Sequence, residues 1–282
     1  MKVAITGASS NLGKKLTSFF LKKKCEVYAL SRSNIQQNES NFKYVNYHFN
    51  KTFDSNFFIT NKIDILILCA FNRDFINYSD YKETNLNANL NLIDIAKDQV
   101  NKIFFISSIA SHENSFSNYG KVKYSMERRF SDNVIIIRPG MFFENNNCKE
   151  LEKLELIINK IKIFPLLLNK KNFLYFTEIN EFCELLYRLI NHNNYKRYII
   201  LNPNKVFLKN LIIYLFKKNH IFPLFIPIPP LLIFYLLQMF EKIKILKKPI
   251  SDALINLILP IDINAIKDFK QIYNKIEFNQ ND

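Results

Sequence analysis

The stretch that decides the fold is the N-terminal run Lys2-Val3-Ala4-Ile5-Thr6-Gly7-Ala8-Ser9-Ser10-Asn11-Leu12-Gly13. Its first five residues are mainly apolar, as in a buried strand, and a helical pattern begins at Asn11. The turn between them uses two of the chain's four glycines. Gly7 suits a tight turn, and Gly13 suits close packing of the helix against the strand. The run therefore predicts a strand, a glycine turn and a helix whose N-terminus can face an anion.

Outward from this run, short apolar runs alternate with amphipathic stretches as far as about residue 140. The predicted strands are Lys2–Thr6, Glu26–Leu30, Tyr44–His48, Ile65–Ala70, Lys102–Ser107 and Val134–Arg138. The predicted helices are Asn11–Lys23, Tyr81–Lys97 and Asn118–Ser131. Repeated strand–helix units build a doubly wound parallel sheet. The sequence therefore predicts an α/β fold with a Rossmann-type sheet, an architecture that binds dinucleotides.

The pattern changes after Pro139-Gly140, where the apolar runs become longer and less regular. Helical patterns recur at Leu151–Ile161, Asn180–Ile190, Leu208–Lys217 and Leu231–Ile243. We therefore expect a dinucleotide-binding domain over residues 1–145. We expect residues 146–282 to form a smaller, mainly helical C-terminal lobe that completes the fold and covers the substrate cleft.

One segment of the second half, Ile221–Phe240, carries no charge over twenty residues, a length that would allow a membrane span. Four prolines interrupt its first half and leave a helix of only about a dozen residues, too short to span. Lysines flank the segment on both sides, so a helix lying on an anionic membrane surface stays open. The length favours a buried or interdomain helix over membrane contact.

The chain is basic, with 39 Lys+Arg against 25 Asp+Glu and a formal net charge of +14. The lysines are spread along the chain without an arm or stripe, and no nucleic-acid-binding module is present, so no nucleic-acid partner is expected. The four cysteines form no C-x-x-C pair and lie at no ligand spacing from histidine, so no metal site is expected. Reduced thiols and a first strand that follows directly on Met1 favour a cytoplasmic protein.

The end of the second predicted strand normally decides which nicotinamide cofactor binds. An acidic residue there holds the ribose 2′-hydroxyl of NAD. This sequence instead has Ser31 and Arg32, and an arginine can pair with the 2′-phosphate of NADP. The cofactor is therefore expected to be NADP or NAD, with NADP favoured by Arg32. In the glycine turn, Ser9 and Ser10 can add hydroxyl hydrogen bonds to the phosphates.

Tyr119 and Lys123 lie four residues apart in a predicted helix, which places both side chains on one face. An ammonium beside a phenol favours the phenolate, and such a tyrosine can move a proton to or from a substrate oxygen. Ser107 and Ser108 end the preceding strand, at the carboxyl edge where ligands of such sheets bind. A serine there can hydrogen-bond the reacting oxygen.

Together these motifs resemble the extended branch of the short-chain dehydrogenase/reductase superfamily, which includes NAD-dependent epimerase/dehydratases that act on nucleotide sugars. The matching blocks, in order, are Thr6–Gly13, Asp64–Ala70, Asn85–Ala96, Ile106–Ser108, Tyr119–Lys123 and Ile137–Gly140. The resemblance implies that Tyr119 is the acid/base and Lys123 its electrostatic partner. It implies that Ser108 orients the substrate oxygen and that Asn85 helps to place the lysine. The cofactor contacts implied are Gly7, Ser9, Ser10, Asn11, Leu12, Gly13, Ser31, Arg32, Cys69, Ala70, Tyr119, Lys123 and Pro139.

The sequence departs from the family pattern in three places. The cofactor turn lacks one glycine, at Ser10 under the extended pattern or at Asn11 under the shorter-chain pattern. Only ten residues separate Ser108 from Tyr119, where nucleotide-sugar enzymes usually have a longer loop. The second half carries no readable sugar-nucleotide signature.

The expected function is that of an NAD(P)-dependent epimerase or reductase on a nucleotide-linked sugar, using Tyr/Lys/Ser acid–base chemistry with hydride transfer. Dehydratases of the family generally have an acidic residue directly after the catalytic serine or threonine, whereas Ile109 and Ala110 follow Ser108 here. The alternative is a non-catalytic dinucleotide-binding protein of the same fold, acting as a sensor or an assembly subunit. The resemblance also implies a homodimer.

Overall fold

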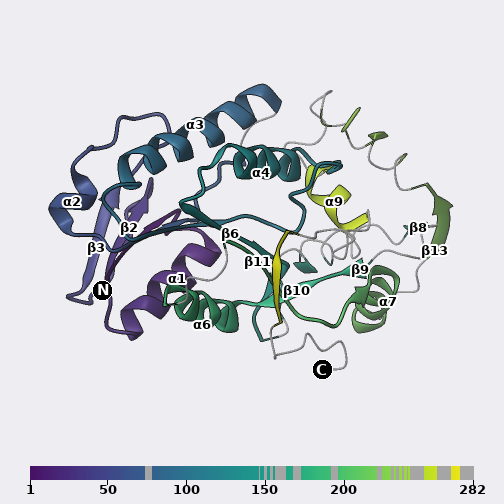
Figure 1. Ribbon diagram of the computed structural model, residues 1–282. Helices are drawn as coiled ribbons and strands as arrows, with labels where there is room; N and C mark the ends of the chain where they lie inside the picture. The colour runs from purple at the N-terminus through teal and green to yellow at the C-terminus, as the bar shows by residue number, and fades with distance from the viewer. Residues whose placement is uncertain are drawn as a thin grey trace.

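The computed structural model describes residues 1–73, 78–145, 147–148, 151–152, 155, 163–167, 173–191, 196–220, 224–229, 232, 235–236, 238–239, 241, 251–258 and 268–273. Its centre is an eight-stranded sheet with the strand order β14-β11-β6-β5-β4-β1-β2-β3 (Figure 1). All neighbouring strands pair in parallel. The strands are β1 (Lys2–Thr6), β2 (Glu26–Ser31), β3 (Phe42–Asn46), β4 (Ile65–Leu68), β5 (Lys102–Ile106), β6 (Val134–Pro139), β11 (Arg197–Leu201) and β14 (Lys270–Tyr273).

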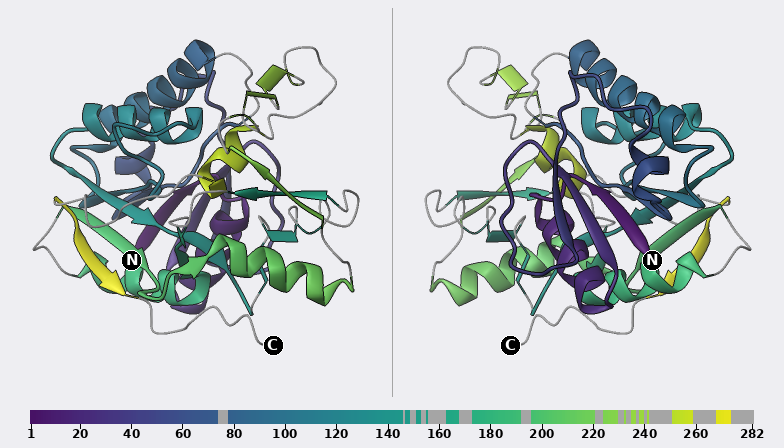
Figure 2. Two further views of the ribbon diagram at one scale, coloured as in Figure 1. Left: turned by 90° about the vertical axis from the view of Figure 1, so that its right-hand side faces the viewer. Right: turned by 90° about the vertical axis from the view of Figure 1, so that its left-hand side faces the viewer.

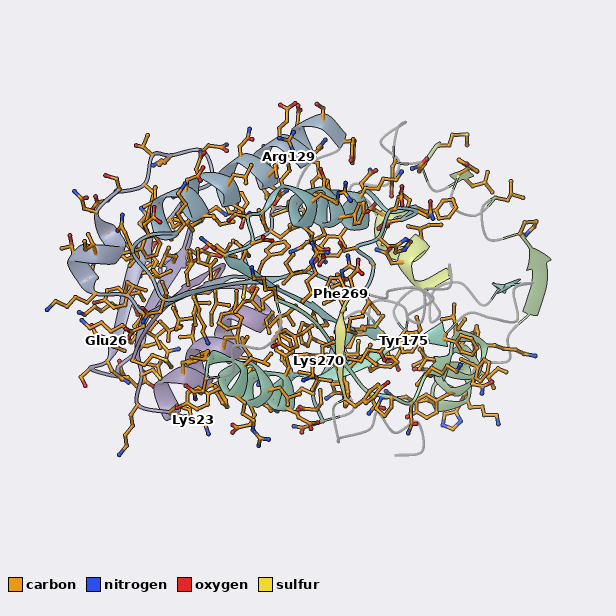
Figure 3. The ribbon with its side chains drawn as sticks, viewed as in Figure 1. Lys23, Glu26, Arg129, Tyr175, Phe269 and Lys270 are labelled. Carbon is orange, nitrogen blue, oxygen red and sulfur yellow. The ribbon has the colours of Figure 1, made fainter. Side chains whose placement is uncertain are left out.

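Helices cover both faces of this sheet (Figures 1 and 2). One face carries α1 (Asn11–Lys22) and α6 (Ile179–Ile190), and the other carries α2 (Phe57–Asn61), α3 (Tyr78–Ala96) and α4 (Asn118–Arg129). Successive residues of a strand serve opposite faces: Phe104 packs on the α1/α6 side and Phe105 on the α3/α4 side. Figure 3 shows the side chains that fill both layers. The doubly wound Rossmann-type sheet is therefore confirmed.

The predicted elements of the first half lie close to those observed. Most ends agree within two residues, and α3 begins three residues earlier than predicted, at Tyr78. The third strand is shifted, because β3 pairs with β2 from Phe42, opposite Val27, rather than from Tyr44. The short helix α2 was not predicted, since its five residues are too few to display a helical period.

The second half adds two strands to the same sheet and one helix to one of its faces. β11 pairs with β6, β14 pairs with β11, and α6 packs against α1. The remaining strands, all short, are β7 (Met141–Phe143), β8 (Ile163–Leu167), β9 (Phe173–Leu174), β10 (Phe176–Glu178), β12 (Val206–Phe207) and β13 (Leu224–Ile228). They pair as β7 with β10, β9 with β12 and β8 with β13. The described part of this half thus holds more strand than the mainly helical lobe that was expected.

Two of the four helices predicted in the second half are confirmed, as α6 and α7 (Leu208–Lys218). The predicted helices Leu151–Ile161 and Leu231–Ile243 lie mostly outside the described residues. Four described residues of the latter are 42–60% exposed and do not show the burial that was expected: Leu232, Tyr235, Leu236 and Met239. None of the described helices is both long and apolar enough to cross a bilayer. A further helix, α9 (Ser251–Ile258), was not predicted and lies beside α4 (Figure 1).

Candidate active site

The turn between β1 and α1 leaves no room for side chains at its two glycines. Gly7 has a φ of +66°, and a Cβ there would lie 2.8 Å from the Cα of Ala70. A Cβ on Gly13 would lie 2.2 Å from the carbonyl oxygen of Gly7. The hydroxyl of Thr6 accepts hydrogen bonds from the backbone N–H groups of Cys69 and Ala70, at 3.1 and 3.0 Å. The ends of β1 and β4 are thus tied together beneath the turn.

The first turn of α1 has two unused hydrogen-bond donors. The Ser10 hydroxyl accepts from the N–H of Gly13 at 3.0 Å, and the Ser10 carbonyl accepts from the N–H of Lys14 at 2.9 Å. Within the described part of the chain, the N–H groups of Asn11 and Leu12 have no acceptor. Free donors at a helix N-terminus form a site for an anion such as a pyrophosphate. This donor set therefore fits a dinucleotide.

Ser10, where the extended pattern has a glycine, shows no backbone strain. Its φ is −72° and its ψ 167°, an extended conformation open to any residue. Its hydroxyl is directed at Gly13 of its own helix. A side chain at this position therefore does not distort the turn.

The end of β2 lies against the same turn. The buried Ser31 hydroxyl donates to the hydroxyl of Ser9 at 2.8 Å and accepts from the N–H of Ser33 at 3.2 Å. Arg32, next to Ser31, is exposed. The predicted cofactor residues of the first two strands are therefore adjacent in space, at the carboxyl edge of the sheet.

Lys123 of α4 is buried in an aromatic cage at the same edge. Its side chain is 2% exposed, and its Nζ donates to the carbonyl oxygen of Ile106 at 2.7 Å. The Nζ lies 4.4 Å from the ring centroid of Phe105, 4.7 Å from that of Phe71 and 5.9 Å from that of Tyr119. Such cation–π contacts offset only part of the cost of burying an ammonium group.

Burial shifts the pKa values of two groups in this cage, the Lys123 amine and the Cys69 thiol. Desolvation lowers the pKa of Lys123 to about 7, and the positive charge of Arg73 acts in the same direction. Burial raises the pKa of the Cys69 thiol to about 12, although the charge of Lys123 opposes this shift. The free protein therefore holds a neutral thiol and a lysine that exchanges its proton near neutral pH.

The segment that follows β4 contacts the Tyr119 ring through two side chains. The ring of Phe71 meets it edge-on at 5.0 Å, and the guanidinium of Arg73 lies 4.8 Å from its centroid. Asn85, fully buried in α3, holds this segment by two hydrogen bonds to the backbone of Asn72, at 2.8 and 2.9 Å. Asn85 was expected to help place Lys123. It does not contact the lysine in a described hydrogen bond, but it holds the backbone of the segment whose Phe71 ring contacts the lysine Nζ. Its contacts therefore suit an indirect form of the expected role.

A buried ion pair lies one helical turn beyond Lys123. Glu127, one helical turn beyond Lys123, accepts from the Nε of Arg138 at 3.0 Å and also from its Nη2. The Ser107 hydroxyl donates to the same carboxylate. Both charged side chains are less than 5% exposed. Arg138 stacks at 4.1 Å on Phe269, which precedes β14 (Figure 3).

The remaining predicted residues lie at neighbouring strand ends. Ser108 is half-buried, and its hydroxyl accepts from the N–H of Ala110 at 3.2 Å. Pro139 ends β6, and its carbonyl accepts from the N–H of Ile109 at 3.1 Å. The loop after β5, which carries Ser108, is thereby tied to the end of β6.

The start of α4 involves a residue that the sequence does not single out. Asp252 of α9 accepts hydrogen bonds from the backbone N–H groups of Asn118 and Tyr119. Asp252 lies far from any recognised motif, so no signal in its own neighbourhood points to it. Phe71 and Arg73 were also missed, although they follow directly on Cys69 and Ala70, which were predicted to face the cofactor.

Comparisons with known proteins agree with this fold. Residues 3–128 match the model of the NAD dependent epimerase/dehydratase family. The chain is similar to UDP-glucuronic acid 4-epimerase from Bacillus cereus, solved in complex with NAD (16% identity, TM-score 0.65, 80% of this chain and 87% of that chain). It is also similar to UDP-glucose 4-epimerase from Thermotoga maritima, solved with UDP-glucose (13% identity, TM-score 0.62, 81% and 86%).

A third similar structure is a dTDP-4-dehydrorhamnose reductase from Clostridium acetobutylicum (17% identity, TM-score 0.61, 81% of this chain and 84% of that chain). At these identities the structural likeness establishes the fold. No curated protein sequence matches the chain.

Proposed function

We propose that this chain, whose residues 3–128 match the model of the NAD dependent epimerase/dehydratase family, is an NAD(P)-dependent epimerase or reductase of a nucleotide-linked sugar. The observation that carries the proposal is the arrangement of Tyr119 and Lys123. Both project from one face of α4 at the carboxyl edge of the sheet, and Lys123 is bonded to the last residue of β5. Two further observations support the proposal. The fold is similar to that of solved nucleotide-sugar epimerases, and the first turn of α1 has two backbone N–H groups without an acceptor among the described residues.

The cofactor would be held by the turn after β1. The N–H groups of Asn11 and Leu12 would bind the pyrophosphate, with the hydroxyl of Ser9 beside them. A bound nicotinamide would supply or accept the hydride. We further propose that Arg32, exposed beyond β2, favours NADP by pairing with its 2′-phosphate, whereas the solved relatives named above include a complex with NAD.

Tyr119 would move the proton of the reacting sugar oxygen. The guanidinium of Arg73 and the Nζ of Lys123 lie 4.8 and 5.9 Å from the centroid of its ring. With its pKa lowered to about 7, Lys123 can also take up or release a proton near neutral pH. Ser108 would hydrogen-bond the same sugar oxygen and orient it.

The experiment is a calorimetric titration with NADPH and NADH, followed by a screen of nucleotide sugars for turnover. We expect micromolar binding with NADPH preferred, and loss of that preference in Arg32→Ala. Tyr119→Phe should bind the cofactor as the wild type does but lose at least about 100-fold in turnover. Tyr124→Phe, on the same helix, is the matched control and should retain turnover.

Two results would contradict the proposal in different ways. If neither nucleotide binds, the open donors of α1 do not serve a dinucleotide. If a nucleotide binds but no nucleotide sugar turns over in a Tyr119-dependent manner, the chain is a non-catalytic dinucleotide-binding protein, the alternative reading of its sequence.

A further inference from the structure

The helix that carries Tyr119 begins with the same five-residue pattern as α1. Residues 10–14 read Ser-Asn-Leu-Gly-Lys, and residues 117–121 read Ser-Asn-Tyr-Gly-Lys. In α4 the Ser117 hydroxyl accepts from the N–H of Gly120 at 2.9 Å, and the Ser117 carbonyl accepts from the N–H of Lys121 at 3.0 Å. These bonds repeat those of Ser10 in α1. The pattern alone would therefore leave the second and third residues of the motif with open N–H groups in both helices.

In α4 those two donors are occupied by Asp252. Its Oδ2 accepts from the N–H of Tyr119 at 3.1 Å, and its Oδ1 accepts from the N–H of Asn118. Because both oxygens accept, the group binds in the manner of a carboxylate, and its charge complements the positive end of the helix dipole. A side chain from the second half of the chain thus fills the anion site that α1 leaves open.

The position of Asp252 is itself fixed. The preceding residue, Ser251, donates from its N–H at 2.7 Å and from its hydroxyl at 2.6 Å to the carboxylate of Glu241. Ile255, one turn further along α9, is 1% exposed. The carboxylate is therefore held on an anchored helix.

This arrangement has an energetic cost. Burial raises the pKa of Asp252, although the N–H groups of Tyr119 and Asn118 and the charge of Arg73 oppose the shift. Its contacts thus only partly offset the desolvation of the charge. An uncharged cap would avoid that cost, as the serine caps of the same helices do.

Asp252 also belongs to the group of charges around the phenol. The charged or titratable groups that act on it are Arg73 of the segment after β4, Glu241 and, from α3, Tyr81. The guanidinium of Arg73 and the Nζ of Lys123 both lie within 6 Å of the centroid of the Tyr119 ring. The negative charge of Asp252 therefore partly offsets the positive charge that Arg73 and Lys123 bring to the surroundings of the phenol.

We propose that Asp252 is a positioning residue for Tyr119, through which the second half of the chain fixes the start of the catalytic helix and moderates the positive charge around the phenol. This inference rests on the proposed function for its catalytic consequence but not for its structural part. The two parts are tested separately.

The structural part is tested by amide hydrogen exchange, measured residue by residue with NMR on the full chain. In Asp252→Ala we expect the amides of Asn118 and Tyr119 to lose at least about tenfold in protection. The amides of Gly120 and Lys121 should keep theirs, because their acceptors belong to Ser117. Equal loss at all four amides would reveal general destabilisation, and unchanged protection would show that the cap is absent. Either result would overturn the proposal.

The catalytic part is tested by the pH dependence of turnover in Asp252→Asn, with Asp94→Asn as the control, since Asp94 is an exposed aspartate of α3. We expect cofactor affinity to stay within about threefold of wild type. The acid limb of the profile should move to lower pH by at least about half a unit, because loss of a negative charge favours the deprotonated form of a nearby titrating group. A lower rate with no movement of the acid limb of the pH profile would show that Asp252 acts only as a structural cap of α4. If the wild type turns over no nucleotide sugar, the proposed function fails and with it this part of the proposal, while the exchange experiment still decides the other.

Discussion

The starts of α1 and α4 have nearly the same local sequence and opposite surroundings. Each begins Ser-Asn-X-Gly-Lys, each serine caps its own glycine, and each glycine is pressed against a backbone carbonyl. At α1 two N–H groups remain open toward the edge of the sheet, whereas at α4 Asp252 accepts from both. The comparison teaches that five residues can build a helix start that binds anions, while distant residues decide whether a ligand or the protein itself supplies the anion.

The two starts also differ in what surrounds them. The α1 site consists mainly of backbone groups and small side chains, as a site for a phosphate does. The α4 site consists of side chains from several elements, including the buried cation Lys123 and the buried pair Glu127–Arg138. Changes of backbone geometry should therefore damage both sites, and changes of buried charge should damage only the second.

The largest effect is expected where the two starts are alike. Gly13→Ala and Gly120→Ala would each place a Cβ within 2.3 Å of a backbone carbonyl oxygen, which cannot retreat without moving a strand or loop. We expect each to lower the free energy of unfolding by more than about 3 kcal/mol. Urea denaturation measures this, with Ser18→Ala in α1 as the control. An ordinary helical glycine would gain about 1 kcal/mol from the same change, so a gain would refute the close packing.

The next effect should separate the two sites. Glu127→Gln leaves Arg138 buried without its counter-charge, and we expect a loss of about 3–5 kcal/mol in the free energy of unfolding. Cofactor binding at α1 should be retained in the fraction that is folded. Glu113→Gln, an exposed glutamate in the loop after β5, is the control and should be neutral. A neutral Glu127→Gln would show that the pair is dispensable.

A smaller, pH-dependent effect concerns Lys123. Burial lowers its pKa in the folded state to about 7, against a usual value of 10.5. Below pH 7 the amine is charged in both states, and the folded protein bears the whole cost of burying the charge. Between pH 7 and 10.5 the folded state releases the proton while the unfolded state keeps it, so stability rises with pH in this window.

Replacement of Lys123 by methionine removes this dependence. We expect Lys123→Met to be more stable than wild type near pH 7, with an advantage that shrinks by up to about 1.4 kcal/mol per pH unit toward pH 9. Denaturant titrations at several pH values test this, with the exposed Lys121→Met as the control. An advantage that is constant with pH would mean that Lys123 stays charged in the folded protein.

The smallest effect is expected for the caps themselves. Ser10→Gly introduces the glycine of the extended pattern, and because Ser10 already has an extended backbone we expect cofactor affinity to change less than about threefold. Stability should fall by only a few tenths of a kcal/mol, roughly the cost of replacing a serine cap by glycine. Calorimetric titration decides the point, and Ser117→Gly is its counterpart on α4. A tenfold gain in affinity would show that the serine side chain obstructs the pyrophosphate.

The sequence predicted the first half of the fold well because its signals are local. The strand period of Lys2–Thr6, the glycines of the turn and the four-residue spacing of Tyr119 and Lys123 are all read within a short window. The strands β11 and β14 were not predicted, because their place in the sheet depends on pairing with distant strands rather than on their own pattern.

The candidate site divides in the same way. Its cofactor turn was predictable from glycine spacing, and its tyrosine and lysine from the helix period. The aromatic cage and the role of Asp252 were not, because Phe71, Phe105 and Asp252 come from three segments that only the folded chain brings to Lys123 and Tyr119. Buried charges are specified by such long-range contacts, which a single sequence does not reveal.

The order of the sheet has a consequence for the chain as it leaves the ribosome. Once β6 is made, the cofactor turn and the catalytic helix are complete. One edge of β6 has no partner strand until β11 is made. At typical rates of synthesis, the roughly 60 residues between them take about 3–12 s to appear. For that time the nascent protein presents an unpaired, apolar edge strand, which invites pairing with another chain. A product truncated near residue 145 would keep that edge permanently, and we expect it to aggregate.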